Sequence, residues 1–167
     1  WEAGLAEIGP GAEEGRILAA MQGAVFEGGG DYAGNEFVIG SGEHALLCRS
    51  QTGRRRLGAE DQITLEWAGV RARYHAALMK TVIVGRPRPR HEALQAAAEE
   101  ALTACEAALR PGAPMGAAFD AHARTLDAHG LARHRLNACG YALGPRFAPS
   151  WMEDQMFYEG AATVIEA

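Results

Sequence analysis

Residues Thr64–Gly85 read TLEWAGVRARYHAALMKTVIVG, and this stretch carries the strongest structural pattern of the chain. Glu66 has large apolar neighbours on both sides, as in an extended strand whose successive side chains face opposite environments. A second run of strand-forming residues, Tyr74–Val84, follows after a glycine. The pattern predicts an antiparallel hairpin with strands at Ile63–Trp67 and Tyr74–Val84, joined around Gly69.

The rest of the chain shows alternating helical and extended patterns with proline and glycine between them. Hairpins and helices without regular crossovers favour an α+β fold. We expect the helix at residues 90–109 to pack across the hairpin sheet. The expected elements are helices at 12–26, 90–109 and 114–129, strands at 36–39, 45–49, 136–143 and 161–165, and a long loop at 144–160.

Composition limits the class of protein. With 167 residues and 48% hydrophobic content, the chain can bury one sizeable core, so we expect a single domain over residues 1–167. A net charge of −5 argues against a nucleic-acid partner, and the basic cluster Arg54–Arg56 is short enough to be a solvated turn. No apolar run reaches membrane-spanning length, which argues against a membrane partner.

The chain contains three cysteines, Cys48, Cys105 and Cys139. Their odd number and wide spacing predict neither a disulfide framework nor a structural zinc site. A reducing cytoplasm fits this pattern best. Cys105 falls on the apolar face of a helical pattern, so we interpret it as a core residue.

Four segments occur in an order that resembles a known superfamily: Asp31–Gly42 (DYAGNEFVIGSG), the hairpin, Asn137–Gly144 (NACGYALG) and Pro149–Asp154 (PSWMED). They resemble the catalytic domain of the creatinase, aminopeptidase P and methionine aminopeptidase superfamily, and especially its ectoine-hydrolase-like and Xaa-Pro peptidase-like members. The resemblance implies the pita-bread fold, present here as a partial catalytic domain. The family's preceding N-terminal domain and the end of its catalytic domain would lie outside this chain.

The resemblance also locates the positions that bind two metal ions in the metallopeptidases. Glu66 occupies the first aspartate position, Ala77 the second, and Tyr141 replaces a metal-binding histidine. Two further ligands, both glutamates in the family, would lie beyond Ala167. Bridging a metal pair requires carboxylate oxygens, which a methyl group does not supply. We therefore predict no metal ligands and no cofactor, with a single divalent metal ion as the alternative.

Three residues at or beside this frame are candidates for catalysis. Glu66 can act as general acid or base, or be an ordinary solvated strand residue. His75 can transfer protons or bind substrate, or be a hydrogen-bonded histidine on the outer face of the sheet. Tyr141 can donate a hydrogen bond to a substrate carbonyl or carboxylate, or simply fill the space of the lost ligand.

Three charged residues of the expected loop at 144–160 are candidates for substrate binding. Arg146 can hold a carboxylate with two parallel hydrogen bonds, and the pair Glu153 and Asp154 can bind an amine or amidine. The alternative is an exposed loop with ordinary surface charges.

Together these features favour a cytoplasmic hydrolase, homodimeric by family resemblance, that cleaves a C–N bond in a small charged metabolite similar to ectoine or creatine. We expect it to work without metal and to bind a small-molecule substrate. One alternative is a metal-dependent Xaa-Pro dipeptidase. The other is a non-catalytic binding protein built on the same fold.

Overall fold

The structure is a computed structural model that describes residues 1–46 and 54–167. The chain forms two compact units. The first contains residues 1–87 and 143–151, and the second contains residues 88–142 and 152–167. The prediction that the helix at 90–109 packs across the hairpin sheet involves both units and stays a prediction. Within the described residues, no helix combines the length and apolarity needed to cross a membrane.

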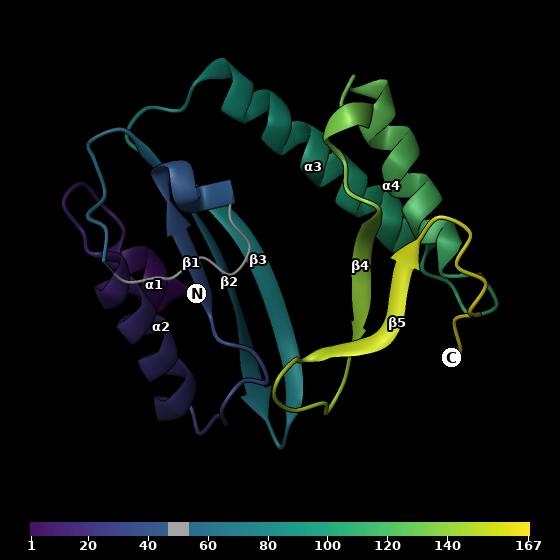
Figure 1. The fold of residues 1–167 in the computed structure, drawn as a ribbon, viewed down its shortest axis with the longest axis horizontal. Coiled ribbons are helices and arrows are strands. Elements are labelled where there is room, and N and C mark those ends of the chain that lie inside the picture. Colours follow the sequence, from purple (N-terminus) through teal and green to yellow (C-terminus); the bar gives the residue numbers. More distant parts are fainter. Residues whose placement is uncertain (47–53) are drawn as a thin grey trace. The chain divides into compact units, whose positions relative to one another are not determined.

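The first unit is built on a three-stranded antiparallel sheet with the order β1-β2-β3 (Figure 1). The strands are β1 (Val38–Ser41), β2 (Asp61–Arg71) and β3 (Tyr74–Val84). The predicted hairpin is confirmed, but it turns at Ala72 and Arg73, not around Gly69, which lies within β2 opposite Ala76.

Both turn residues have left-handed backbone conformations, with φ of 49° at Ala72 and 70° at Arg73. Two-residue hairpin turns of this kind favour Asn-Gly or Asp-Gly, because a side chain in this conformation is strained. The strain costs about 1–2 kcal/mol per residue. The sequence Ala-Arg therefore gives no signal for a turn at this position. Contacts with other parts of the chain are needed to stabilise the left-handed conformation of the two residues.

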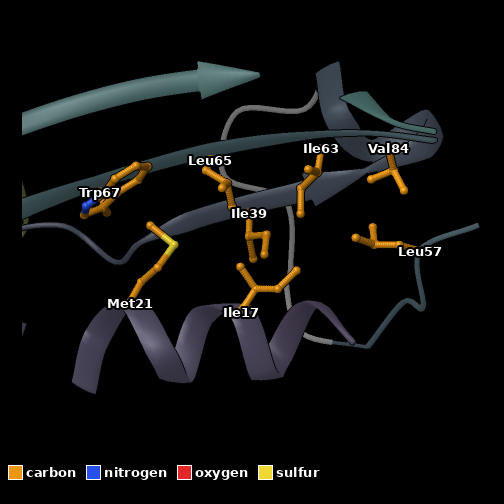
Figure 2. Packing of buried hydrophobic residues seen from close by; sticks show 8 residues of the cluster. All are labelled: Ile17, Met21, Ile39, Leu57, Ile63, Leu65, Trp67 and Val84. Atoms are coloured by element: carbon orange, nitrogen blue, oxygen red, sulfur yellow. The ribbon is translucent and has the colours of Figure 1, made fainter. Parts of the chain in front are cut away.

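The core of this unit lies between the sheet and the helix α2 (Glu14–Glu27), which follows the short helix α1 (Glu2–Glu7). Fully burying one such apolar side chain contributes about 1.5–3 kcal/mol. Trp67 at one end of the core stacks on Trp1, with ring centroids 4.7 Å apart. Figure 2 shows the buried cluster, which consists of Ile17, Met21, Ile39, Leu57, Ile63, Leu65, Trp67 and Val84.

Polar side chains join α2 to the sheet at the end of β1. The hydroxyl of Ser41 donates to the Glu14 carboxylate over 2.5 Å, and both side chains are buried. The Arg55 guanidinium donates to the Ser41 hydroxyl at 2.8 Å and to Asp61 at 2.5 Å. Because each of these buried groups has a partner, the network adds stability instead of a desolvation penalty.

Two elements near this network differ from the prediction. Ala45 belongs to a 3₁₀ helix, η1 (Gly42–Leu46), instead of the strand expected at 45–49. The remainder of that expected strand, including Cys48, lies outside the described residues. Strand β1 starts at Val38, two residues later than expected.

The second unit contains the helices α3 (Pro89–Ala108) and α4 (Gly116–Ala128), the 3₁₀ helix η2 (Ala132–His134), and the strands β4 (Ala138–Leu143) and β5 (Met152–Tyr158), which run in opposite directions in Figure 1. The two α-helices pack against each other. Strand β5 contradicts the prediction of one loop over residues 144–160. Its sequence MEDQMFY places Glu153 beside Asp154 and Phe157 beside Tyr158, so it lacks the alternation of polar and apolar residues that indicates a strand. Residues 161–165 form backbone hydrogen bonds with residues 112–116, including one isolated bridge, instead of a regular strand.

The thiols of Cys105 on α3 and Cys139 on β4 form a hydrogen bond between a helix and a strand of the second unit. The Cys105 thiol also donates to the carbonyl of Ala118 at 3.5 Å. Burial is the main cause that raises the pKa of both thiols, and the neighbouring Cys105 adds to it for Cys139, whose pKa reaches about 12. Both residues are half-buried, so the predicted core role of Cys105 is confirmed only in part.

We expect the substitution Asp61→Asn to lower the free energy of unfolding by about 1–2 kcal/mol at neutral pH. Burial raises the pKa of Asp61, but hydrogen bonds from Gly58, Arg55 and Gln62 outweigh it and leave the pKa below 3.8. A carboxyl group with a depressed folded-state pKa contributes stability above its unfolded pKa and loses it as the pH falls through the folded value.

The difference between wild type and this variant should therefore shrink below about pH 4. Urea denaturation between pH 2.5 and 7 measures it, with Asp120→Asn, an exposed residue of α4, as the control. A difference that is constant over this pH range would contradict the role of the charged Asp61.

We also expect Cys139 to react with iodoacetamide at least about 100-fold more slowly in the native chain than in the urea-denatured chain at pH 8. A thiol with a pKa of about 12 is thiolate in only about one molecule in ten thousand at this pH. Peptide-resolved mass spectrometry measures the two rates separately for each cysteine. Equal native and denatured rates would show that the thiol is neither buried nor perturbed.

Candidate functional site

Glu66 lies in the middle of β2, opposite Val38 on β1 and Met79 on β3. Its two neighbours, Leu65 and Trp67, are buried in the core between the sheet and α2. Since side chains alternate along a strand, Glu66 lies on the opposite face of the sheet, where it is half-buried. This arrangement agrees with the alternation expected from the sequence and presents a carboxylate on the face that α2 does not cover.

The second metal-ligand position, Ala77, lies on the same face as Glu66. Ala77 pairs with Ala68 across the hairpin, and Glu66 pairs with Met79 two residues along the strands. The side chains of both pairs therefore lie on the same face of the sheet. Ala68 is fully buried, so two methyl groups stand side by side next to the carboxylate. The position that would carry a bridging aspartate therefore has no donor, and neither does its cross-strand partner.

The residues of this chain do not fit a two-metal centre. Glu66 is the only carboxylate among the ligand positions that the resemblance assigns within the chain, and Tyr141 offers a phenol. Among residues 1–46 and 54–167, no group of three histidine, cysteine or acidic side chains lies close enough to hold a metal ion. The expected absence of a metal cofactor stays a prediction.

His75 is buried at the start of β3, and both of its ring nitrogens contact backbone groups. The backbone N–H of Gly34 donates to Nε2 at 2.8 Å, and Nδ1 lies 3.2 Å from the carbonyl oxygen of Gly144. The first contact requires an unprotonated Nε2, so Nδ1 carries the proton and donates to Gly144. His75 thus connects the segment before β1 with the segment after β4.

The segment at residues 143–151 packs closely against the segment that contains Gly34. A methyl group added at Gly34 would lie 3.1 Å from the backbone nitrogen of Trp151 and 3.3 Å from the carbonyl oxygen of Arg146. Trp151 is completely buried, and its ring centroid lies 6.2 Å from that of His75. Glycine at position 34 and the His75 ring together fix the path of this segment.

The structure places the six predicted site residues in different parts of the molecule. Glu66 and His75 lie on the same face of the first unit's sheet, and Arg146 is exposed in the segment that His75 holds. Tyr141, half-buried on β4, belongs to the second unit, together with the remaining two residues, Glu153 and Asp154 on β5.

The acidic pair was expected in a loop, but it lies in a strand. Consecutive residues of a strand point to opposite faces, so Glu153 and Asp154 do not face the same ligand as a pair. Glu153 is half-buried and Asp154 is exposed. The roles predicted for the six residues stay predictions.

Sequence reasoning missed the packing around His122 in the second unit. His122 packs against Phe119 with ring centroids 5.9 Å apart, and its Nδ1 is buried without a partner among the described residues. Burial and the nearby Arg135 lower the pKa of His122. The helical spacing of Phe119 and His122 was the available signal. His129 is exposed and contacts Glu100 at 2.8 Å.

Comparisons with known proteins agree with this picture. Residues 1–166 match metallopeptidase family M24. The chain is 30% identical over 148 residues to the uncharacterized hydrolase/peptidase y4tM of Sinorhizobium fredii, covering 86% of this chain and 37% of that protein. It is 26% identical over 161 residues to the ectoine hydrolase of Halomonas elongata, covering 91% of this chain and 40% of that protein.

Among solved structures, the prolidase from Pyrococcus furiosus superposes on 99% of this chain with a TM-score of 0.89 and 18% identity, and 48% of the prolidase chain is covered. At this identity the likeness concerns the fold alone. The predicted α+β pita-bread fold, as part of a catalytic domain, is confirmed. The chain spans less than half the length of each of these relatives. It belongs to metallopeptidase family M24.

Proposed function

We propose that the protein containing this chain is a hydrolase of the creatinase and Xaa-Pro peptidase type that cleaves a C–N bond in a small charged metabolite without a two-metal centre. The observation that carries the proposal is that a carboxylate, Glu66, and a methyl group, Ala77, occupy the two ligand positions on one face of the sheet. The similarity to an ectoine hydrolase supports a small charged nitrogen compound as substrate.

The chemistry proposed for Glu66 follows from its position. Hydrolysis of a C–N bond adds water to carbon, breaks the bond to nitrogen and delivers a proton to the departing nitrogen. A half-buried carboxylate beside apolar groups can accept the proton of the attacking water and pass it to that nitrogen. This role requires no second ligand on the strand opposite Glu66.

His75 has a different part in the proposal. Because both ring nitrogens contact backbone groups, its contribution is to hold the segments around Gly34 and Gly144, not to transfer protons. Arg146 belongs to the second of these segments and is proposed to bind a substrate carboxylate. Tyr141 remains in the proposal through the resemblance, and Glu153 and Asp154 remain because carboxylates can bind an amine or amidine.

The same proposal includes a homodimer in the cytoplasm and a small-molecule substrate, with no nucleic-acid or membrane partner. A metal-dependent dipeptidase and a non-catalytic binding protein are distinguished from it by the experiments below.

We expect Glu66→Gln in the full-length protein to lower turnover by about 10²–10⁴-fold, the usual contribution of a general acid or base. The change keeps the shape of the side chain and removes its charge, so thermal stability should change little. Hydrolysis of cyclic amidines, creatine-like compounds and Xaa-Pro dipeptides is the assay. Glu60→Gln, which removes an exposed carboxylate next to β2, is the matched control.

Unchanged turnover in the Glu66→Gln protein would remove this residue from the mechanism. If the wild type hydrolyses none of the three substrate classes, the loss of the metal-ligand positions is better explained by a non-catalytic binding protein.

We expect Ala77→Asp to increase the affinity of the full-length protein for Mn²⁺ or Co²⁺, because it restores a carboxylate on the face that carries Glu66. Ala76→Asp, one residue away on the opposite face of the same strand, should leave the affinity unchanged. Isothermal titration calorimetry of the two variants and the wild type measures the difference.

Elemental analysis of wild-type protein purified without chelator provides the complementary test. Two equivalents of a transition metal per chain, lost in the Glu66→Gln variant, would contradict the proposal and favour the metal-dependent dipeptidase.

A further inference from the structure

A cavity of about 540 Å³ lies in the first unit beside the turn of the β2–β3 hairpin. Three of its lining residues carry aromatic rings, and two carry opposite charges. All of the lining residues belong to one compact unit. They are Phe26, Gly30, Asp31, Tyr32, Ala72, Arg73 and Phe147.

The aromatic rings of this cavity are unusually open to solvent for large apolar side chains. Phe26 is 39% exposed, Phe147 47% and Tyr32 69%. Phe26 and Tyr32 pack edge to face with ring centroids 5.1 Å apart. Exposed aromatic groups gathered around a hollow are typical of sites that bind a planar or apolar group.

Among the residues that the structure describes, neither charge of the cavity forms an ion pair. The Arg73 guanidinium lies over the ring of Phe147, 5.9 Å from its centroid, and forms no ion pair with any described residue. Asp31 likewise forms no ion pair in the described chain, and its Oδ2 accepts the backbone N–H of Arg73 at 3.3 Å. A guanidinium and a carboxylate therefore line one cavity without pairing to each other.

The backbone around the cavity holds these groups in place. Arg73 adopts its left-handed conformation in the strained hairpin turn, where the contact with Asp31 and the stacking on Phe147 keep it. Phe147 reaches the cavity because its segment is fixed by His75 at Gly144. The lining residues come from α2, the segment before β1, the hairpin turn and the segment at 143–151, so the cavity depends on the fold of the whole unit.

We propose that this cavity binds a small zwitterionic ligand with a planar or apolar body. The ligand's carboxylate pairs with the Arg73 guanidinium, whose fork of donors suits a carboxylate. Its cationic nitrogen pairs with Asp31, and its body packs against the rings of Phe26, Tyr32 and Phe147. The site lies at the turn end of the hairpin, away from Glu66, and does not depend on the reaction proposed there.

The test uses L-tryptophan as the probe and isothermal titration calorimetry on the full-length protein. Tryptamine, which lacks the carboxylate, and indole-3-propionate, which lacks the ammonium group, should each bind at least tenfold more weakly than tryptophan. L-Alanine, which lacks the planar body, should also bind at least tenfold more weakly.

Two variants remove one charge each from the cavity. Arg73→Asn removes the guanidinium with a residue that tolerates the left-handed conformation, and Asp31→Asn removes the carboxylate charge. Each should weaken tryptophan binding at least tenfold. Arg71→Asn, which removes a positive charge from the same end of the hairpin but not from the cavity, should change it less than twofold.

Absence of tryptophan binding by the wild type at millimolar concentration would overturn the proposal. So would equal binding of tryptophan and indole-3-propionate, which would indicate a site for anions only, or unchanged binding in both charge variants. Thermal unfolding shows whether each variant is folded. The Glu66→Gln protein should bind tryptophan like the wild type, which separates the failure of this proposal from the failure of the proposed hydrolase function.

Discussion

The register of β2 is the constraint on which the first unit depends. Ile63, Leu65 and Trp67 enter the core against α2, and the same two-residue period turns Glu66 to the other face. A shift of one residue would bury a carboxylate in an apolar core and expose a tryptophan, which is strongly unfavourable. The packing that stabilises the sheet therefore also fixes the direction of its most chemically significant side chain.

Hydrogen bonds of a buried histidine join distant segments on the face that carries Glu66. His75 lies on this face near the turn, and its two contacts connect segments that are 41 and 69 residues away in sequence. Leaving either backbone group buried without a partner would cost about 1–3 kcal/mol. One buried imidazole thus joins two segments that lie far apart in the sequence.

Much of the fold could be predicted from the sequence, because long periodic segments carry a strong signal. The hairpin and three of the helices were found within a few residues of their observed ends. The turn was missed because Ala72 and Arg73 are poor residues for a left-handed turn, and only the contacts with Asp31 and Phe147 explain them. Strand β5 was missed because its polar residues resemble a loop.

The candidate site was less predictable than the fold, since residue types alone do not reveal which hydrogen bonds form. The motif assigned Glu66 and Ala77 to two ligand positions, and both residues lie on one face of the sheet. The motif positions could not show that both ring nitrogens of His75 contact backbone groups. Nor could they show that Glu153 and Asp154 lie next to each other in a strand, where their side chains point to opposite faces. Such contacts depend on segments that are distant in sequence, and no local pattern encodes them.

The length of the hairpin separates Glu66 on β2 from the charged cavity at the turn. Glu66 and the last residue of β2, Arg71, are five residues apart, about 17 Å along a strand that rises roughly 3.3 Å per residue. This distance exceeds the Debye length of about 8 Å at physiological ionic strength, so charges at the turn are largely screened from Glu66. The carboxylate on the strand and the charged cavity at the turn can therefore respond to substitution independently, although one rigid hairpin supports both.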